Sequence, residues 1–323
     1  MRAIEQRGYG DPREVLHLAE REVPTFEAGQ VLVRVHASSA NPYDWHLICG
    51  EPTLMRPQLG GIRAPRRVVG ADFAGVVEAL GRDVQGVAVG DEVYGFADGA
   101  FAEYVAAPAG RVARKPATLT FAEAAAVPLA AITALQGLRH GELAEGQRVL
   151  VMGASGGVGT FAVQLATHMG AQVTGVCSTG RLDLVRSLGA DDVIDYTTQD
   201  PTSGPASYDL ILQLGGTYSP RALRRVLTPR GTLVQSHGDG SRLLGPLRSM
   251  ASGALLNLVS TQRITMFVAD EDTASLDELR DLIEAGHLRP VIDSEYPLER
   301  AGEAVALVKD GRPAGKVVVT IAP

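Results

Sequence analysis

The sequence has few cysteines, no long apolar run and no excess of basic residues, and each absence excludes a class of protein. Among its 323 residues only Cys49 and Cys177 are cysteines, too few for a disulfide framework or a zinc site with four thiolate ligands. No apolar stretch approaches the roughly 20 residues that span a bilayer. The N-terminus, MRAIEQRGYG, lacks the apolar segment of a signal peptide. We therefore expect a cytoplasmic protein that does not enter a membrane.

The charge balance argues against nucleic acid as a partner. The formal net charge is -7 and the sequence pI is ≈ 5.5, whereas phosphate backbones select basic surfaces. Hydrophobic residues make up 45% and charged residues 21% of the chain, which is ordinary for a soluble globular protein. The length is sufficient for two domains and a large core.

The most informative stretch is residues 148–170, RVLVMGASGGVGTFAVQLATHMG. An apolar run ends at Gly153, three more glycines follow at 156, 157 and 159, and apolar residues at helical spacing begin at Phe161. This order predicts a strand, a glycine turn and a helix that begins inside the turn. The N–H groups at such a helix N-terminus favour a bound phosphate, so we predict a nucleotide-binding turn. The spacing differs from G-x-G-x-x-G, and a loop with a helix-capping glycine is the alternative interpretation.

The apolar pattern changes near Phe121. Before it, short apolar pieces broken by glycines predict a curled sheet or small barrel. Residues 121–138 form an alanine-rich helical stretch that Pro128 interrupts, and we place the domain boundary here. From Arg148 onward predicted strands alternate with helices, which is typical of a doubly wound parallel sheet. These strands are residues 148–152, 172–177, 192–194, 208–214, 232–235 and 264–267.

Two later segments are assigned less specifically. Residues 241–260 are rich in leucine and are predicted either to cover a binding site or to form a packed crossover helix. Near the end, apolar residues at helical spacing stop at Gly311, and residues 316–321 (KVVVTI) predict a strand. This tail completes one of the two domains.

The end of the second predicted strand indicates which dinucleotide binds. An acidic residue there usually holds the ribose 2′-hydroxyl of NADH, whereas an arginine accommodates the 2′-phosphate of NADPH. Here the strand ends at Cys177 and continues Ser178-Thr179-Gly180-Arg181, without Asp or Glu. Two hydroxyls and a guanidinium suit a phosphate, so we predict NADP(H). The alternative is that Ser178 or Thr179 only caps a helix and Arg181 is solvated.

Five segments in this order resemble the medium-chain dehydrogenase/reductase superfamily, and in particular its zinc-independent quinone oxidoreductase branch. They are NPYDWHLICG at 41–50, residues 68–95, GASGGVGTFAVQLA at 153–166, LGADDVIDY at 188–196 and GRPAGKVVV at 311–319. The third segment has the glycine spacing of that branch. The resemblance implies an α/β fold with two domains. A GroES-like β-barrel catalytic domain would span residues 1–122, completed by about residues 290–323, and a Rossmann NADP(H)-binding domain residues 123–289.

The resemblance also implies an enzyme without a metal. Zinc-dependent relatives have a cysteine ligand where this chain has the Asn41 to Asp44 segment, and Gly-His-Glu where it has Gly70-Ala71-Asp72. Since zinc acts as a Lewis acid on alcohols and carbonyls, we expect hydride transfer from NADPH to an activated acceptor, a quinone or an α,β-unsaturated carbonyl. A zinc-free alcohol or carbonyl reductase and a non-catalytic NADPH-binding sensor are the alternatives.

The site residues follow from the same resemblance. Catalytic candidates are Asn41, Tyr43 and His46. His46 is a candidate proton donor because imidazole titrates near neutral pH, and a surface or supporting histidine is the alternative. The implied NADP(H) contacts are Thr133 near the nicotinamide; Ser155, Gly156, Gly157, Val158 and Gly159 at the pyrophosphate; Ser178, Thr179, Arg181 and Tyr196 at the 2′-phosphate; and Leu214, Gly215, Ser236, His237, Phe267, Val268, Ala269 and Lys316 along the cleft. Relatives imply a homodimer through an edge of the nucleotide-binding sheet, near residues 264–268.

Overall fold

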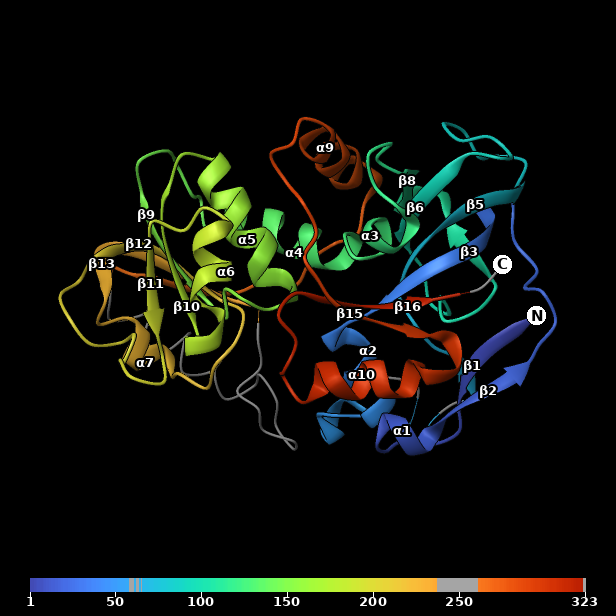
Figure 1. Ribbon diagram of the computed structural model, residues 1–323, viewed down its shortest axis with the longest axis horizontal. Coiled ribbons are helices and arrows are strands. Elements are labelled where there is room, and N and C mark those ends of the chain that lie inside the picture. The colour runs from blue at the N-terminus through green and yellow to red at the C-terminus, as the bar shows by residue number, and fades with distance from the viewer. Residues whose placement is uncertain (58–60, 62–63, 65, 237–260, 322–323) are drawn as a thin grey trace. The chain divides into compact units, whose positions relative to one another are not determined.

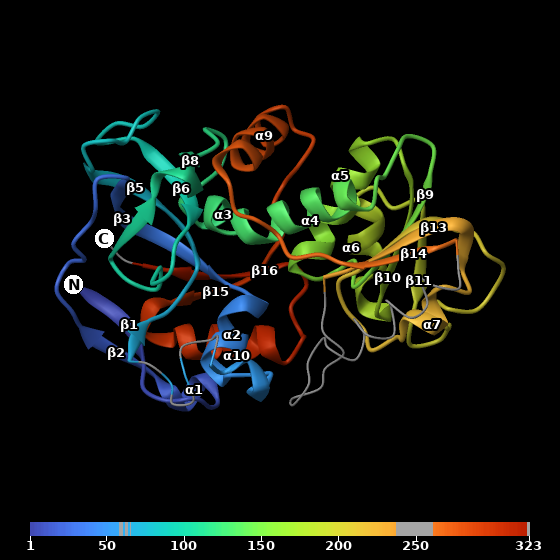
Figure 2. The ribbon, with the colours of Figure 1, turned by 180° about the vertical axis from the view of Figure 1, so that it is seen from behind.

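The computed structural model describes residues 1–57, 61, 64, 66–236 and 261–321. The chain divides into two compact units (Figures 1 and 2). The first contains Met1–Ile132 and Asp270–Pro323, and the second contains Thr133–Ala269. The predicted leucine-rich segment at residues 241–260 lies outside the described residues.

The first unit is built on two sheets. A small antiparallel sheet has the order β2-β1-β4, and a larger one has the order β15-β16-β3-β5-β6-β8, with β7 paired to β3. The strands are β1 (Arg2–Gln6), β2 (Leu16–Glu20), β3 (Gln30–Ala40), β4 (Arg67–Val68), β5 (Asp72–Leu80), β6 (Glu92–Phe96), β7 (Tyr104–Pro108), β8 (Val112–Arg114), β15 (Ile292–Pro297) and β16 (Lys316–Thr320). The helices are α1 (Pro12–Val15), α2 (Pro42–Cys49), α3 (Phe121–Ala125), α9 (Thr273–Glu284) and α10 (Ala301–Lys309), with short 3-10 turns η1 (Thr53–Met55), η2 (Ala109–Arg111) and η4 (Leu298–Arg300).

Strand β3 is the centre of the larger sheet. It pairs with β5, β7 and β16, and Val31 and Val33 are fully buried. The C-terminal strand β16 thereby completes the sheet that the N-terminal residues begin, as the resemblance implied. The side chains of Val31 and Val33 form one apolar core with Phe73, Phe101 and Val317.

The units divide at positions that differ from the predicted domain boundaries, residues 122/123 and 289/290. Helix α9 belongs to the first unit because its N-terminal half is bonded to that unit: Tyr94 Oη donates to Leu276 O at 2.6 Å, and Thr273 Oγ1 donates to Val112 O at 3.1 Å. The start of α4 (Pro128–His140) is held in the same way, since Leu129 N donates to Asp72 Oδ1 at 3.0 Å. These side chain–backbone bonds link residues far apart in sequence, so periodicity does not indicate them.

The second unit contains a six-stranded parallel sheet with the order β11-β10-β9-β12-β13-β14. Its strands confirm the six predicted ones and are β9 (Arg148–Met152), β10 (Gln172–Cys177), β11 (Asp192–Asp195), β12 (Tyr208–Gln213), β13 (Leu227–Gln235) and β14 (Arg263–Met266). Its helices are the C-terminal part of α4, α5 (Gly157–His168), α6 (Leu182–Ser187) and α7 (Pro220–Leu223), with the 3-10 turn η3 (Thr179–Arg181). Because β9 lies between β10 and β12, the order reverses at β9, and ligands bind at such a switch point in open α/β sheets.

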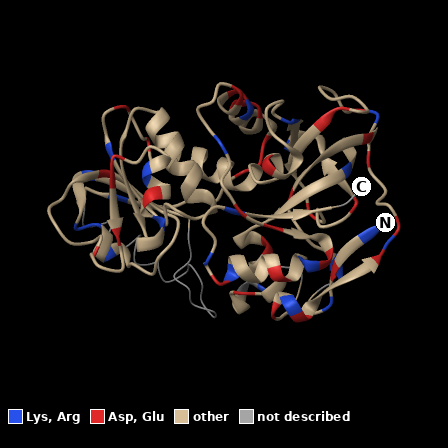
Figure 3. Ribbon diagram, in the orientation of Figure 1, with Lys and Arg blue, Asp and Glu red and all other residues tan. Residues whose placement is uncertain are grey.

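Helix length and the distribution of charge describe both units. No helix in the described part of the chain is long and apolar enough to cross a membrane. Figure 3 shows acidic and basic residues scattered over both units.

Removing the hydroxyl of Tyr94 tests the attachment of α9. Tyr94 is fully buried, so Tyr94→Phe removes the side-chain hydrogen bond that links β6 to the carbonyl of Leu276 in α9 and is expected to lower the free energy of unfolding by about 0.5–1.5 kcal/mol. Urea unfolding and amide hydrogen exchange in α9 measure this. Tyr104→Phe is the control, because no partner of that hydroxyl is found among the described residues, and it is expected to change stability by less than about 0.5 kcal/mol. Equal losses in the two variants would contradict the prediction.

Candidate active site

The glycine turn before α5 has the form of a phosphate site. Gly153 has a φ of 80°, a conformation that glycine adopts without strain, and a Cβ on Gly159 would clash with the carbonyl of Gly153. Helix α5 begins after Gly156 without a side chain that caps its first N–H groups. Among the described residues, a Cβ on Gly156 would meet the oxygen of Gly153 at 3.4 Å. The turn fits the pyrophosphate of a dinucleotide.

The carboxyl ends of four adjacent strands meet beside this turn. Leu214 N donates to Met152 O at 3.1 Å, Ser236 N donates to Gln213 O at 3.1 Å, and Phe267 N donates to Gln235 O at 2.9 Å. These bonds join the predicted cofactor residues Leu214, Ser236 and Phe267 along one edge. Gly215 is close to Gly153 of the glycine turn, where a Cβ on Gly153 would lie 3.2 Å from Gly215 N.

Several other predicted cofactor residues are placed individually. Thr133 is buried on α4 and Val268 is 84% exposed after β14. His237 lies outside the described residues. Beneath the edge, Gln235 Nε2 donates to Gln213 Oε1 at 2.8 Å. No sequence pattern indicated this buried amide pair, which supports the strand ends.

The residues predicted at the 2′-phosphate lie on two adjacent turns. Ser178, Thr179 and Arg181 follow β10, and Tyr196 follows β11, where it is 52% exposed. Tyr196 N donates to Cys177 O at 3.1 Å, which fixes the two turns beside one another. The structure therefore brings these four residues together. It also shows Asp195 and Thr197 between them, which the sequence argument did not select.

A buried polar network lies at the start of α2 in the first unit. Lys316 Nζ is 2.5 Å from Asn41 Oδ1 and 3.4 Å from Asp72 Oδ2. Asp72 Oδ2 also accepts from Asn41 Nδ2 at 2.9 Å and from Ser39 Oγ at 2.8 Å. Lys316, Asn41 and Asp72 are 3%, 2% and 0% exposed. Burial lowers the pKa of Lys316, and the carboxylate of Asp72 acts in the opposite direction.

This network defines what Asn41 and Lys316 contact. Both polar atoms of the Asn41 side chain are bonded to protein groups, since Nδ2 also donates to Ser39 O at 3.1 Å. Lys316 is held away from solvent by the same residues. Asn41 and Lys316, predicted as a catalytic residue and a cofactor contact, therefore fix the chain at the end of β3 and the start of α2.

Tyr43 and His46 follow on α2 with different partners. Tyr43 Oη donates to Asp98 Oδ1 at 3.1 Å, and its ring meets Phe96 edge-on at 5.6 Å between centroids. Burial, with the nearby carboxylate of Asp98, raises the pKa of Tyr43. The hydroxyl consequently keeps its proton and remains a donor across the physiological pH range.

His46 has a defined tautomer. Its Nδ1 lies 2.8 Å from the carbonyl oxygen of Glu51, and a carbonyl only accepts, so Nδ1 carries the proton. Burial lowers the pKa of His46, and the ring stacks on Trp45 at 3.6 Å between centroids. In this neutral form Nε2 is an acceptor. Donation from Nε2 to a substrate, the predicted role, requires a second proton that burial disfavours.

Asp44 completes the start of α2. Its Oδ2 accepts from Asn41 N at 2.7 Å, which forms a capping box. Burial raises the pKa of Asp44 to about 8, although the hydrogen bond from Asn41 acts in the opposite direction. This carboxyl group therefore retains its proton to unusually high pH.

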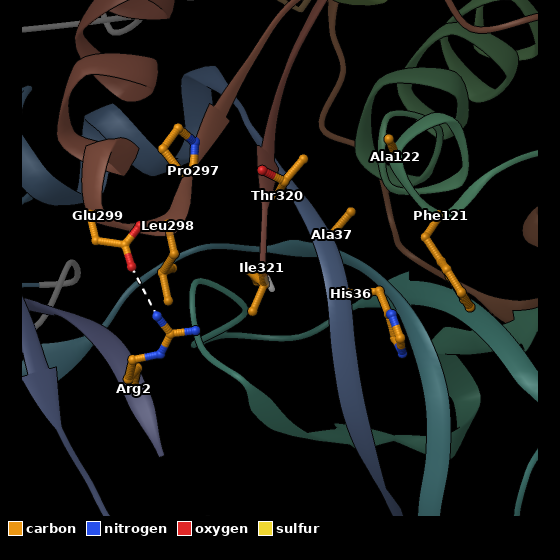
Figure 4. Close-up of a pocket in the computed structure, with 10 residues that line it drawn as sticks. All are labelled: Arg2, His36, Ala37, Phe121, Ala122, Pro297, Leu298, Glu299, Thr320 and Ile321. Carbon is orange, nitrogen blue, oxygen red and sulfur yellow. Dashed lines mark hydrogen bonds and ion pairs between the residues drawn. The ribbon is translucent and has the colours of Figure 1, made fainter. Parts of the chain in front are cut away.

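A separate cavity of about 390 Å³ lies in the first unit (Figure 4). The stacked rings of His36 and Phe121 and the 3.0 Å ion pair of Arg2 with Glu299 line parts of its wall. None of the predicted site residues lines it. We therefore do not assign it to the active site.

Sequence comparisons with known proteins identify the family of this chain. Two family models match, "Alcohol dehydrogenase GroES-like domain" at residues 27–117 and "Zinc-binding dehydrogenase" at residues 188–319. A 2-methylene-furan-3-one reductase of Solanum lycopersicum is 33% identical, covering 99% of this chain and 79% of its own. A chloroplastic quinone oxidoreductase of Triphysaria versicolor is 33% identical, covering 99% and 98%. The chain belongs to the medium-chain dehydrogenase/reductase superfamily, in its quinone-oxidoreductase-like branch.

A solved structure confirms the predicted α/β fold. The quinone oxidoreductase from Coxiella burnetii superposes with a TM-score of 0.88 at 29% identity, over 100% of this chain and 99% of that one. The fold is therefore a GroES-like catalytic unit with a Rossmann unit. The superfamily resemblance inferred from five short segments is confirmed over the length of the chain.

The residues at the positions of the zinc ligands do not fit the metal named by one family model. An amide (Asn41), an alanine (Ala71) and an already hydrogen-bonded carboxylate (Asp72) stand there. The ammonium of Lys316 lies 3.4 Å from that carboxylate and would repel a cation. Across the described ranges no three His, Cys, Asp or Glu side chains are grouped as metal ligands.

The raised pKa of Asp44 predicts a dependence of stability on pH. The group ionises near its model value of 3.8 in the unfolded chain but at about 8 in the folded protein, so the folded state binds more protons in this window. The free energy of unfolding therefore falls as pH rises from about 4 to about 8, by at most about 1.4 kcal/mol per pH unit, and levels off above. In Asp44→Asn this contribution is absent. The stability difference, wild type minus variant, is expected to decline between about pH 5 and 8.

Urea unfolding at a series of pH values measures this difference. Glu123→Gln is the matched control, because Glu123 occupies the same capping-box position on α3 but lies at the surface. Its stability difference is expected to stay level in that window. A level difference for Asp44→Asn would show that the carboxyl is ionised in the folded protein.

Proposed function

We propose that this protein is an NADPH-dependent oxidoreductase that reduces a quinone or an α,β-unsaturated carbonyl without a metal. One observation carries the proposal. The glycine turn at the start of α5, which has no side-chain cap, lies beside the end of β10 that bears Ser178, Thr179 and Arg181. The carboxylate of Asp195, at the end of β11, accepts hydrogen bonds from Thr179 and Thr197. This arrangement suits a 2′-phosphate. The names of the two relatives, a 2-methylene-furan-3-one reductase and a quinone oxidoreductase, support the acceptor class.

The absence of a fitting metal-ligand set restricts the acceptor. When bound, NADPH supplies the hydride. In zinc-dependent enzymes, the metal acts as a Lewis acid that polarises the oxygen of less reactive ketones and alcohols. A quinone or enone is already electrophilic, so its developing oxyanion needs only a hydrogen-bond donor. The residues at the start of α2 provide such a donor.

We assign the donor role to Tyr43. Its hydroxyl retains its proton because burial raises its pKa, and its bond of 3.1 Å to Asp98 can be exchanged for one to a substrate oxygen. His46 supports the site as a neutral acceptor through Nε2. Lys316, Asn41 and Asp72 orient the start of α2 and thereby position both side chains. The proton that completes the reduction comes from solvent.

A panel of acceptors with Tyr43→Phe tests this proposal. The wild type is expected to oxidise NADPH with phenanthrenequinone or a 2-alkenal and not with simple ketones. Tyr43→Phe is expected to lower kcat about 10²-fold with little change in the Kd of NADPH, since the donor acts on the oxyanion. Loss of NADPH absorbance measures turnover, and Tyr104→Phe is the control.

Other outcomes of this experiment would contradict either the proposed activity or the role of Tyr43. Binding of NADPH without turnover on any acceptor would identify a sensor protein. Efficient reduction of simple ketones would identify an alcohol or carbonyl reductase. An unchanged kcat in Tyr43→Phe would remove Tyr43 as the donor.

We further propose a cytoplasmic homodimer that pairs through β14. Among the described strands β14 bonds only to β13, and an unpaired edge is a template for a second copy. Val268, which follows this edge, is 84% exposed. The buried free thiols of Cys49 and Cys177 are compatible with a reducing compartment.

A charge beside this edge is expected to disrupt the dimer. Val268→Lys places like charges near one another across a two-fold interface, so light scattering after size exclusion is expected to show the mass falling from twice 34.0 kDa to 34.0 kDa. Val89→Lys, at another exposed valine, serves as the control. A wild type that is monomeric, or a dimeric Val268→Lys, would contradict pairing at β14.

A further inference from the structure

A carboxylate lies one strand away from the position where NAD-dependent Rossmann domains hold their acidic residue. Strands β10 and β11 are parallel, and Cys177, the last residue of β10, pairs with Asp195, the last residue of β11. Asp195 is therefore at the carboxyl edge, beside the turn that bears Thr179 and Arg181. The end of β10 itself bears no acidic residue.

The oxygens of Asp195 are occupied by groups from both adjacent turns. Thr179 Oγ1 donates to Oδ2 at 2.6 Å, and Thr197 donates to Oδ1 through N at 2.9 Å and Oγ1 at 2.7 Å. The two hydroxyls are also 2.9 Å apart. We call Asp195, Thr179 and Thr197 the carboxylate clamp. These hydrogen bonds lower the pKa of Asp195, so the clamp is built around an ionised group.

The clamp joins the two segments that carry the candidate 2′-phosphate residues. Arg181 is in η3, two positions after Thr179, and Tyr196 stands between Asp195 and Thr197. Loop residues hold a ligand well only if their backbone is fixed. A bond between the turns supplies this constraint without using the side chains that would face the phosphate.

The same bonds determine what Asp195 can accept. A free carboxylate at this edge accepts the ribose 2′-hydroxyl of NADH and repels the 2′-phosphate of NADPH. Here Thr179 and Thr197 already supply three donors to its roughly four acceptor sites. These bonds weaken its attraction for a ribose hydroxyl and reduce its repulsion of a phosphate. Without these hydroxyls, Asp195 would have the chemistry of an NAD-type acidic residue.

We propose that the carboxylate clamp determines the preference for NADPH over NADH, because Thr179 and Thr197 occupy Asp195 and fix the turns of Arg181 and Tyr196. This inference rests on the proposed function and deepens its cofactor assignment. Asp195 acts here as a positioning residue. While both hydroxyls donate to it, the negative charge of Asp195 interacts only weakly with the cofactor.

The double variant Thr179→Val/Thr197→Val tests the clamp by removing both hydroxyls at similar side-chain volume. We expect the Kd of NADH to fall and the Kd of NADPH to rise, so that the ratio of the two changes at least tenfold toward NADH. Titration calorimetry with each cofactor measures this. Adding Asp195→Asn to the double variant is expected to abolish the gain in NADH affinity, since the amide lacks the charge that attracts a hydroxyl donor.

Two further variants separate specificity from folding. Thr198→Val is the matched control, because that hydroxyl bonds the main-chain oxygen of Asp195 at 3.3 Å and not its carboxylate, so the ratio should not change. Thr179→Ser/Thr197→Ser keeps both hydroxyls and is expected to retain the wild-type ratio. If the double valine variant does not fold, Thr179→Ala alone, at an exposed position, is expected to move the ratio about threefold in the same direction.

The outcomes distinguish this inference from the function on which it rests. Equal weakening of NADPH and NADH binding in the double variant, or an unchanged ratio, would reduce the clamp to a structural feature and overturn the inference alone. A wild type that binds NADPH no more tightly than NADH would contradict both the cofactor assignment and the clamp's role.

Discussion

The ion pair of Lys316 with Asp72 is the interaction on which the catalytic unit depends. Lys316 begins β16, Asp72 begins β5, and Asn41, which bonds both, follows β3. Three strand ends distant in sequence are thereby joined in one place. A buried charge is destabilising unless it is paired and hydrogen-bonded, so the network fixes one register among these strands. That register sets where α2 begins, and with it the positions of Tyr43 and His46.

The N-terminus of α5 differs from that of α3 in a way that relates to binding. Helix α3 begins with a capping box, in which Thr120 Oγ1 accepts from the N–H of Glu123. Helix α5 begins without a side-chain cap. A capped helix end is satisfied within the protein, whereas an uncapped one beside glycines retains donors for an anion. The same principle applies to Asp195, whose oxygens are satisfied by threonines and not by a cofactor.

Much of the fold was predictable because its signals are local. The strand, glycine turn and helix at residues 148–168 follow from the spacing of apolar residues and from Gly153. The six parallel strands lie at or near their predicted positions. The site was predictable only as a set of residue types. Asn41 and Lys316 were selected, but their mutual contact, the role of Asp72 and the tautomer of His46 depend on partners far along the chain. The catalytic assignment of Asn41, Tyr43 and His46 and the cofactor contacts remain predictions.

The sequence by itself determined the two-unit α/β architecture, the dinucleotide turn and the superfamily, because periodicity, glycine spacing and motif order are properties of neighbouring residues. The tertiary structure decided which polar groups are satisfied. Burial and long-range hydrogen bonds assign Lys316 to Asn41 and Asp72, attach α9 through Tyr94, and place the hydroxyls of Thr179 and Thr197 on Asp195. Whether a polar side chain is available to a ligand depends on these contacts, which arise only when distant segments pack together.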